Sequence, residues 1–470
     1  MTPSYEALVR AEAPLLDAYL RTLDGDAAPF TIPGHKRNPA FGRVVAGDVP
    51  LHGGLDSIGL TGGVLVEAER RAAALWGADV ARFSVAGSTH GNQAMALAVG
   101  RPGDRVVVPR TLHRSLLLGL VLAGLEPVWL PTRVDPATGL PLGCRVADVE
   151  RCLADHPDVV AVFVGDPTYV GSVGELAQVA DLVHAAGLPL LVDAAWGAHF
   201  GFHPALPDHA MQAGADALVT SAHKMLPAYS QAALVLARTE RIDAARFQRA
   251  FDATHTTSPA GALLASMDAA RALLQLDGQA QLDRPVRLVA SARARLREEA
   301  GLTVLDTVEA TRLVVGLAGV GADGVAVGRE LREAGVEVEL ADRDWLIPVV
   351  TLADTPQTVD RLVEALVASV RRHAGPPRPT VVAASWSVQP EIVIAPREAF
   401  FAPTRTLGVQ EAVGRVSAEL VAPYPPGVPV LAPGERITAE AVASLLAAAQ
   451  AGTRIAYAAD PTMATLRVVA

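Results

Sequence analysis

Short apolar runs alternate with segments of helical periodicity through the middle of the chain, from about residue 64 to residue 237. Runs such as DRVVVP, VVAVFVGDP, LPLLVDAA and DALVTSAHK are apolar at successive positions, as in strands that are buried on both faces. The segments between them, such as ELAQVADLVHAAG, place their apolar residues on one helical face. Strands that alternate with helices predict an α/β fold with a mainly parallel sheet.

The pattern differs on both sides of this region. The first thirty residues have the periodicity of an amphipathic helix, and TIPGHKRNPAFG is typical of a loop. A long helix through DRPVRLVASARARLREEAG begins a smaller α+β region, and Thr438 is expected to cap a late helix, TAEAVASLLAAAQAG. The predicted divisions are an N-terminal arm and entrance loop (1–60), a large domain (61–270), a small α+β domain (271–372), a linker (371–380) and a C-terminal domain (381–470).

Composition and charge exclude several classes of protein. Of the 470 residues, 50% are apolar and 19% are charged, which supports a large core and argues against disorder. A dispersed formal charge of −10 does not suggest a nucleic-acid partner. No apolar run reaches transmembrane length, and the N-terminus lacks the layout of a signal peptide. Only two cysteines, Cys144 and Cys152, occur, so we expect no metal site and no disulfide framework, in keeping with the cytoplasm.

Polar residues follow several of the predicted strands directly. The loop Gly87-Ser88-Thr89 follows one strand, Asp166 and Asp193 follow two others, and Ser221-Ala222-His223-Lys224 follows a fourth. Open α/β sheets bind ligands outside the carboxyl ends of their strands. One edge of the sheet is therefore expected to gather a phosphate-binding loop, two carboxylates, a histidine and a lysine.

The lysine and one carboxylate suggest a specific chemistry. An amine at the mouth of a buried sheet is partly desolvated, which lowers its pKa and lets it form a Schiff base with an aldehyde cofactor. Lys224 alone is better explained as a structural residue that caps a helix or pairs with a carboxylate. Asp193, however, lies at the end of a neighbouring predicted strand, where a carboxylate could pair with the pyridine nitrogen of pyridoxal phosphate.

Two further motifs gain weight from this context. In GSTHGNQAM, Gly87 permits a tight turn, and Ser88 and Thr89 offer hydroxyl and backbone N–H groups where a helix begins, as in phosphate sites. A simple helix cap would explain this motif equally well if it stood alone. In RTLHRS, His113 could stack its imidazole on a flat ring, or it could be an ordinary cap.

Together these motifs resemble those of the fold-type-I pyridoxal-phosphate enzymes. The chain is most similar to the ornithine/lysine/arginine decarboxylase family, in the short form that lacks an N-terminal wing domain. The motifs that carry this resemblance span most of the chain: PGHK (33–36), LDSIGLTGGVLVEAERRAA, GSTHGNQAM, RTLHRS, DPTYVG, DAAWGAHFGFHP, TSAHKMLPAYSQ, THTTSP (254–259) and GRVSAELVAPYPPGVPVLAPGE.

The resemblance implies a pyridoxal 5'-phosphate cofactor and assigns roles to residues of these motifs. Lys224 would hold the cofactor covalently, Asp193 would pair with its pyridine nitrogen, and His113 would stack on its ring. These three are the expected catalytic residues. The other expected cofactor contacts are Ser88, Thr89, Asp166, Trp196, Ser221, His223 and, reaching in from a second subunit, Thr257 or Ser258, with His199 flanking the ring and the PGHK loop forming a wall of the entrance.

The implied reaction is the decarboxylation of arginine, ornithine or lysine to an amine and CO₂, as in polyamine biosynthesis. The resemblance also implies a homodimer or a larger homo-oligomer, and no membrane partner is expected. Asp56, Asp166 and Glu435 are candidates for reading a cationic substrate side chain.

Other hypotheses about the function are compatible with these motifs. The same cofactor supports transamination, elimination and aldol cleavage, and a homologue could bind it without turnover. A nucleotide-binding enzyme is disfavoured, because GSTHGN matches neither GxGxxG nor GxxxxGK[ST].

Overall fold

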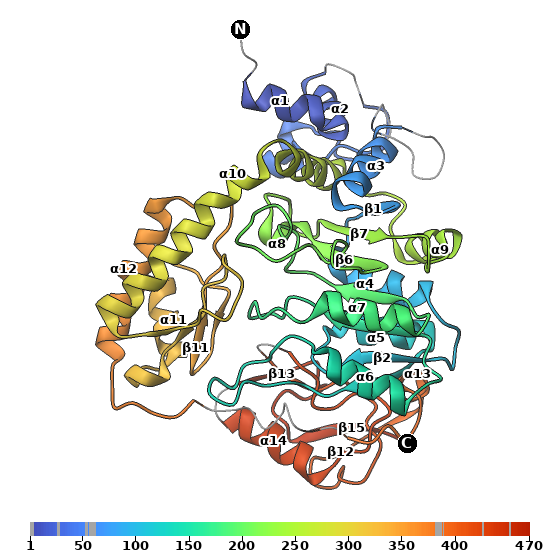
Figure 1. The fold of residues 1–470 in the computed structure, drawn as a ribbon, viewed down its shortest axis with the longest axis vertical. Coiled ribbons are helices and arrows are strands. Elements are labelled where there is room, and N and C mark those ends of the chain that lie inside the picture. Colours follow the sequence, from blue (N-terminus) through green and yellow to red (C-terminus); the bar gives the residue numbers. More distant parts are fainter. Residues whose placement is uncertain are drawn as a thin grey trace. The chain divides into compact units, whose positions relative to one another are not determined.

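The computed structural model describes residues 4–25, 29–51, 55, 63–380, 388, 390–424, 427–450 and 453–470 (Figure 1). The chain divides into two compact units. The first contains residues 1–98 and 189–283, and the second contains residues 99–188 and 284–470. The domain boundaries predicted from the sequence stay a prediction. Within the described ranges, no helix is both long and apolar enough to cross a membrane.

The first unit builds a four-stranded part of the large sheet, in the order β1-β7-β6-β5. Strands β6 and β5 pair in parallel, whereas β7 is antiparallel to both β1 and β6. Every residue of β6 and β7 is buried, including the polar Thr220 and Ser221 that end β6. The elements are α1 (Tyr5–Glu12), α2 (Pro14–Asp24), α3 (Val64–Trp76), β1 (Val80–Ser84), α4 (Gly87–Ala98), β5 (Leu190–Asp193), β6 (Ala217–Ser221), α8 (Ala222–Met225), β7 (Ala233–Ala237), α9 (Ala244–Thr254) and the first part of α10 (Gly261–Ala300).

Helix α4 packs closely on this sheet because its fifth residue is a glycine. A Cβ atom at Gly91 would lie 2.3 Å from Val219 Cγ2 on β6 and 3.0 Å from Val235 Cγ2 on β7. Both distances are too short for an ordinary contact, so only glycine lets the helix approach the strands this closely. The amino end of α4, which carries Ser88 and Thr89, is thereby fixed relative to the carboxyl end of β6.

The second unit contains a parallel three-stranded part, in the order β4-β2-β3. Parallel pairing therefore predominates among the described strand pairs of the large sheet, and the predicted α/β fold is confirmed. The elements are β2 (Arg105–Pro109), α5 (Arg114–Ala123), β3 (Glu126–Leu130), α6 (Val146–Asp155), β4 (Ala161–Gly165) and α7 (Leu176–Ala185).

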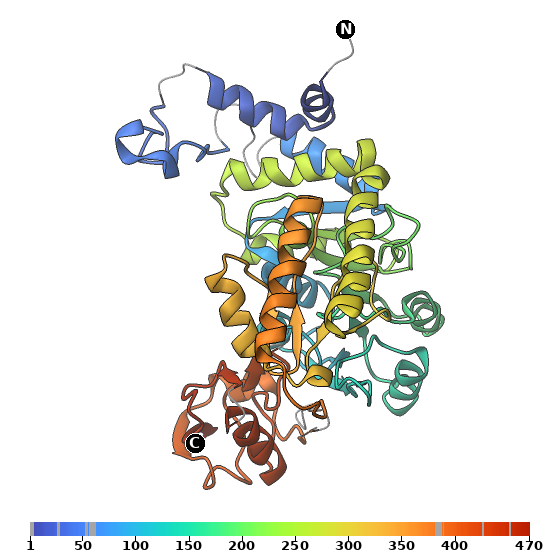
Figure 2. The same cartoon turned by 90° about the vertical axis from the view of Figure 1, so that its left-hand side faces the viewer.

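The rest of the second unit contains two smaller cores. The second half of α10 runs beside α12 (Figures 1 and 2), and both share one apolar core with α11 and strands β8, β9 and β11. The C-terminal residues form another core around α14. The elements are β8 (Thr303–Val304), β9 (Val315–Gly316), α11 (Gly324–Glu333), β10 (Leu340–Ala341), β11 (Trp345–Ile347), α12 (Pro356–His373), α13 (Pro396–Phe401), β12 (Thr404–Gly408), β13 (Ala422–Tyr424), α14 (Ala439–Gln450), β14 (Arg454–Ala456) and β15 (Thr465–Val469).

Some elements differ from the predicted ones. The single N-terminal helix is two helices, because Pro14 starts α2 and holds the preceding Ala13 at φ −111°, ψ 81°, outside the helical region. The run DALVTSAHK is a strand only as far as Ser221, and α8 begins at the next residue, Ala222. Helix α12 extends to His373 and so includes the first residues of the predicted linker. Thr438 does cap α14, since its Oγ1 accepts from Ala441 N at 3.0 Å.

Candidate active site

The ends of β5 and β6 bring the predicted carboxylate and lysine into one region of the first unit. Asp193, the last residue of β5, is in register with Val219 of β6. The pairing continues beyond the strands, because Ala194 N donates to Val219 O at 2.8 Å and Ser221 N donates to Ala195 O at 3.3 Å. Helix α8, which carries Lys224, starts directly after this pairing, so two adjacent parallel strands deliver both groups, as predicted.

The carboxylate of Asp193 is held by two hydrogen bonds. Asn92 Nδ2, on α4, donates to Oδ2 at 2.7 Å, and Ala195 N donates to Oδ1 at 3.1 Å. Asn92 is completely buried, whereas Asp193 is half-buried. Together the two bonds fix the orientation of the carboxylate. Asn92 was not among the predicted site residues, although it lies one helical turn after Ser88, and that spacing was the available signal.

Two predicted phosphate ligands meet at the amino end of α4. Ser88 Oγ lies 2.6 Å from Ser221 Oγ, so two hydroxyl groups from distant parts of the chain converge. Gly87 adopts φ +70°, and its N–H donates to Gln231 O at 2.8 Å, which ties the loop to the residues before β7. Thr89 is exposed in the first turn of α4. Hydroxyl groups at the start of a helix form a suitable cradle for an anion.

Lys224 lies in the single turn of α8, between the buried residues Ala222 and Met225. Its Nζ is 4.3 Å from the centroid of the Trp196 ring, within the range of a cation–π contact. Trp196 is itself buried, so an apolar surface covers the amine on that side. His199 is completely buried, with its ring 4.9 Å from that of Phe200.

His223, beside the lysine, has a defined tautomer. Its Nδ1 lies 2.9 Å from Ala232 O, and because a carbonyl oxygen can only accept, Nδ1 carries the proton. Burial lowers the pKa of His223, the bond to Ala232 opposes this, and the nearby Lys224 charge lowers the pKa further. In the neutral ring Nε2 is consequently an acceptor, so His223 needs a second proton before it can donate to a phosphate.

Two predicted site residues, His113 and Asp166, belong to the second unit. His113 is the N-cap of α5, and its Nδ1 accepts from Ser115 N at 3.3 Å and lies 2.7 Å from Ser115 Oγ. Asp166 follows β4 and is buried, and its Oδ2 accepts from Gly174 N at 2.6 Å. Burial raises the pKa of Asp166 to about 7, although the bond from Gly174 opposes the shift. Their contacts with the cofactor stay predictions.

Three further predicted residues are Thr257, Asp56 and Glu435. Thr257 is exposed in the turn after α9, so its role across a subunit boundary stays a prediction. Asp56 lies outside the described residues. Glu435 is completely buried and ion-paired with Arg110, so the interpretation of Glu435 as a reader of the substrate side chain is wrong. Its negative charge is already matched inside the protein.

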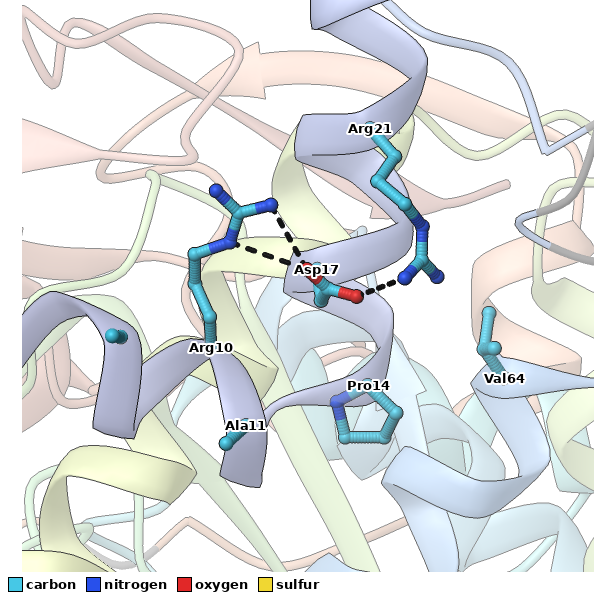
Figure 3. A pocket seen from close by; sticks show the side chains of 7 residues that line it. Arg10, Ala11, Pro14, Asp17, Arg21 and Val64 are labelled. Carbon is cyan, nitrogen blue, oxygen red and sulfur yellow. Dashed lines mark hydrogen bonds and ion pairs between the residues drawn. The ribbon is translucent and has the colours of Figure 1, made fainter. Parts of the chain in front are cut away.

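An open pocket on the N-terminal arm involves none of these residues. Figure 3 shows Arg10 and Arg21 directed at the two oxygens of Asp17. The Arg10 Nη2–Asp17 Oδ1 distance is 2.9 Å. The pocket is lined by Ala7, Arg10, Ala11, Pro14, Asp17, Arg21 and Val64. Because surface ion pairs of this kind are common and weak, we assign the pocket no chemistry. Within the described ranges, no group of His, Cys, Asp and Glu side chains is arranged to hold a metal ion.

Comparison with known proteins gives one consistent family. The model of the Orn/Lys/Arg decarboxylase major domain matches residues 13–316, and that of the family's C-terminal domain matches residues 380–455. An arginine decarboxylase of Halalkalibacterium halodurans is 34% identical over 97% of this chain and 98% of its own length. An arginine decarboxylase of Bacillus subtilis is 32% identical over the same shares.

Solved structures agree with the fold. The constitutive lysine decarboxylase of Escherichia coli has a TM-score of 0.82 at 21% identity, over 99% of this chain and 83% of that one. Lysine decarboxylase A of Pseudomonas aeruginosa has a TM-score of 0.84 at 21% identity, over 99% of this chain and 81% of that one. The family resemblance inferred from the motifs is confirmed: the chain is an enzyme of the Orn/Lys/Arg decarboxylase family, and it carries both the major and the C-terminal domain of that family.

Proposed function

We propose that this enzyme binds pyridoxal 5'-phosphate and decarboxylates a basic L-amino acid, with arginine as the first substrate to test. One observation supports the proposal most directly. Asp193 ends β5, the helix that carries Lys224 follows the adjacent parallel strand β6, and Ser221 at the end of β6 contacts Ser88. Arginine is put before ornithine and lysine because the relatives that match at 32–34% identity are named arginine decarboxylases. The products would be agmatine and CO₂.

The residues of the first unit fit the cofactor group by group. A phosphate needs donors in an anion cradle, which Ser88, Ser221 and the amino end of α4 can supply. A protonated pyridine nitrogen needs a fixed carboxylate, and Asp193 is fixed by two donors. An aldehyde needs a primary amine, which Lys224 supplies. When bound, pyridoxal phosphate would act as the electron sink that stabilises the negative charge left at Cα when CO₂ departs.

The chain's own groups would control protons and water around that chemistry. The Asp193 carboxylate would hold a proton on the pyridine nitrogen. Lys224 Nζ, once released from covalent attachment, would be a base or acid that moves a proton close to Cα. Trp196 would shield that amine from bulk water on one face, because its ring lies over Nζ at 4.3 Å. The choice of which Cα bond breaks would therefore rest on protein groups.

The decisive experiment incubates the purified chain and pyridoxal phosphate separately with arginine, ornithine and lysine, and measures CO₂ and amine products. The proposal expects stoichiometric CO₂ and one preferred amine. The Lys224→Ala variant should lose the near-visible band of the bound cofactor and at least about a hundredfold of the activity. A keto acid in place of an amine would indicate transamination. Cofactor binding without any turnover would indicate a non-catalytic homologue.

A further inference from the structure

The loop that carries His113 is anchored in the C-terminal domain at its first residue. Arg110 directly follows β2 and is completely buried. Its Nε donates to Pro429 O at 3.0 Å, and its Nη2 donates to Val430 O at 2.9 Å. Both Nη atoms also donate to Glu435, whose side chain is completely buried, with an Nη2–Oε2 distance of 2.9 Å. The three partners lie in the segment that matches the family's C-terminal domain.

The environment of this ion pair allows a single arrangement. Glu435 Oε2 also accepts from Ala432 N at 2.7 Å, and the Arg110 guanidinium lies 4.8 Å from the centroid of the Trp129 ring. Every nitrogen of the guanidinium group is thus hydrogen-bonded and one of its faces is covered. Loss of either charge would leave the other one buried without compensation, so the pair resists displacement.

The helix that follows His113 contacts residues of the C-terminal region at both ends. Arg114, its first residue, places its guanidinium 4.4 Å from the centroid of the Tyr457 ring. At the other end of α5, Arg397 Nη1 donates to Val121 O at 2.9 Å and to Leu122 O at 2.8 Å. An arginine that donates to the last carbonyl groups of a helix stabilises its end. Contacts to residues of the C-terminal region therefore flank His113 on both sides in sequence.

From these contacts we infer that the C-terminal domain positions the His113 imidazole, and that Glu435 is a positioning residue acting through Arg110. This inference rests on the proposed function and on the stacking of His113 on the cofactor ring, which the family resemblance implies. The imidazole itself is oriented by Ser115, but the backbone from which it projects is fixed by Arg110 and Arg114. The C-terminal domain would thus contribute to cofactor binding although Glu435 touches neither cofactor nor substrate.

A double-mutant cycle on the full-length chain tests the inference. In Glu435→Gln the side-chain amide N–H₂, a donor, faces Arg110 and Ala432 N, which are themselves donors. The substitution also removes the negative charge that holds Arg110. We expect this variant to raise the dissociation constant of pyridoxal phosphate by up to about tenfold, the size of a lost ring–ring contact. It should also change the circular dichroism of the cofactor band. His113→Ala should do the same, and Glu435→Gln should add little in the His113→Ala background.

The matched control is Glu419→Gln. Glu419 is also a buried glutamate of the C-terminal domain, but it accepts from Ala459 N and Arg467 N, each at 2.7 Å. It should lower thermal stability and leave cofactor affinity at the wild-type value. The inference is overturned if Glu435→Gln behaves like this control, or if its effect on affinity adds fully to that of His113→Ala.

A milder pair of variants serves if Glu435→Gln does not fold. Tyr457→Phe keeps the aromatic ring under Arg114, whereas Tyr457→Leu removes it. Weaker cofactor binding in Tyr457→Leu alone supports the inference, and equal binding in both variants contradicts it. The proposed function is judged separately: if the wild-type chain shows no cofactor band with added pyridoxal phosphate, that proposal fails before any variant is compared.

Discussion

Asn92 Nδ2 donates a hydrogen bond to Asp193 Oδ2 across 2.7 Å, from a helix to the end of a strand about a hundred residues later in the chain. The amide is completely buried, and the second donor to the carboxylate is a backbone N–H group, Ala195 N. Asn92 is therefore the side chain that sets the direction of Asp193. If Asp193 pairs with the cofactor, Asn92 controls the reaction without touching the substrate.

Replacing Asn92 by leucine keeps the volume of the side chain but removes the donor. A hydrogen bond to a charged group contributes roughly 1.5–3 kcal/mol, so we expect kcat to fall by about ten- to a hundredfold with a small change in KM. Steady-state kinetics with saturating cofactor measures this. Asn92→Asp, which sets two carboxylates against each other, should be more severe. The interpretation would be contradicted if the variant lost thermal stability together with kcat and did not show a larger change in kcat than in KM.

The tautomer of His223 predicts a pH dependence of cofactor affinity. Nδ1 donates to Ala232 O, and burial lowers the pKa of His223, so Nε2 is an acceptor at neutral pH in the free enzyme. A bound phosphate dianion would raise this pKa, because Nε2–H can then donate to it. At a pH between the pKa of His223 in the free enzyme and its pKa in the bound enzyme, cofactor binding would take up a proton. Affinity should therefore be highest below the pKa of the free enzyme and should fall as pH rises through the pKa of the bound enzyme.

Titration of the apoenzyme with pyridoxal phosphate from pH 5.5 to pH 9 measures this dependence. The cofactor's own phosphate and Lys224 also titrate, so the comparison is with His223→Gln, which keeps a donor but cannot gain a proton. The variant should show a shallower fall in affinity with pH than the wild type. Parallel curves would mean that His223 stays neutral in the bound enzyme.

Asp166 should make folding stability depend on pH. Burial raises its pKa from 3.8 to about 7 in the folded protein. The folded state therefore binds the proton more tightly than the unfolded state, and this contribution is complete below about pH 4 and lost as pH rises through 7. The difference is worth up to about 4 kcal/mol in the free energy of unfolding. Asp166→Asn, which can still accept from Gly174 N, should be more stable than the wild type at pH 8.

Denaturant unfolding of the apoenzyme from pH 4 to pH 8.5 checks this prediction. Asp158→Asn is the control, because the bond from Arg105 lowers the pKa of this exposed carboxylate. Its contribution is present above its unfolded pKa and is lost as pH falls, which is the opposite sign. If Asp166→Asn and the wild type show the same pH profile, Asp166 is ionised in the folded protein at neutral pH.

The sequence predicted those features that depend on local pattern. The apolar run that ends at Ser221 and the position of Asp193 after another such run were enough to place both at neighbouring strand ends. The contact of Asn92 with Asp193 depends on how α4 is rotated against the sheet, and this follows from tertiary packing. Glu435 was misread for the same reason, since its partner Arg110 is 325 residues away and charge alone cannot distinguish a buried ion pair from a substrate contact.

The close approach of α4 to β6 gives a last prediction. A methyl group at position 91 would lie 2.3 Å from Val219 Cγ2, so Gly91→Ala must push the helix away from the strand. We expect a loss of about 1–3 kcal/mol in stability and weaker cofactor binding, because Ser88 on α4 would move away from Ser221 on β6. Adding Val219→Ala should restore part of both, because it removes the closest atom, whereas Val219 Cβ at 2.9 Å and Val235 Cγ2 at 3.0 Å would stay close to the methyl group. Gly319→Ala, whose new methyl group would meet only Thr303 at 3.6 Å, should change neither. Thermal unfolding with and without pyridoxal phosphate separates the effect on stability from the effect on cofactor binding. If the cofactor stabilises Gly91→Ala as much as it stabilises the wild type, the packing of α4 does not determine the geometry of the phosphate cradle.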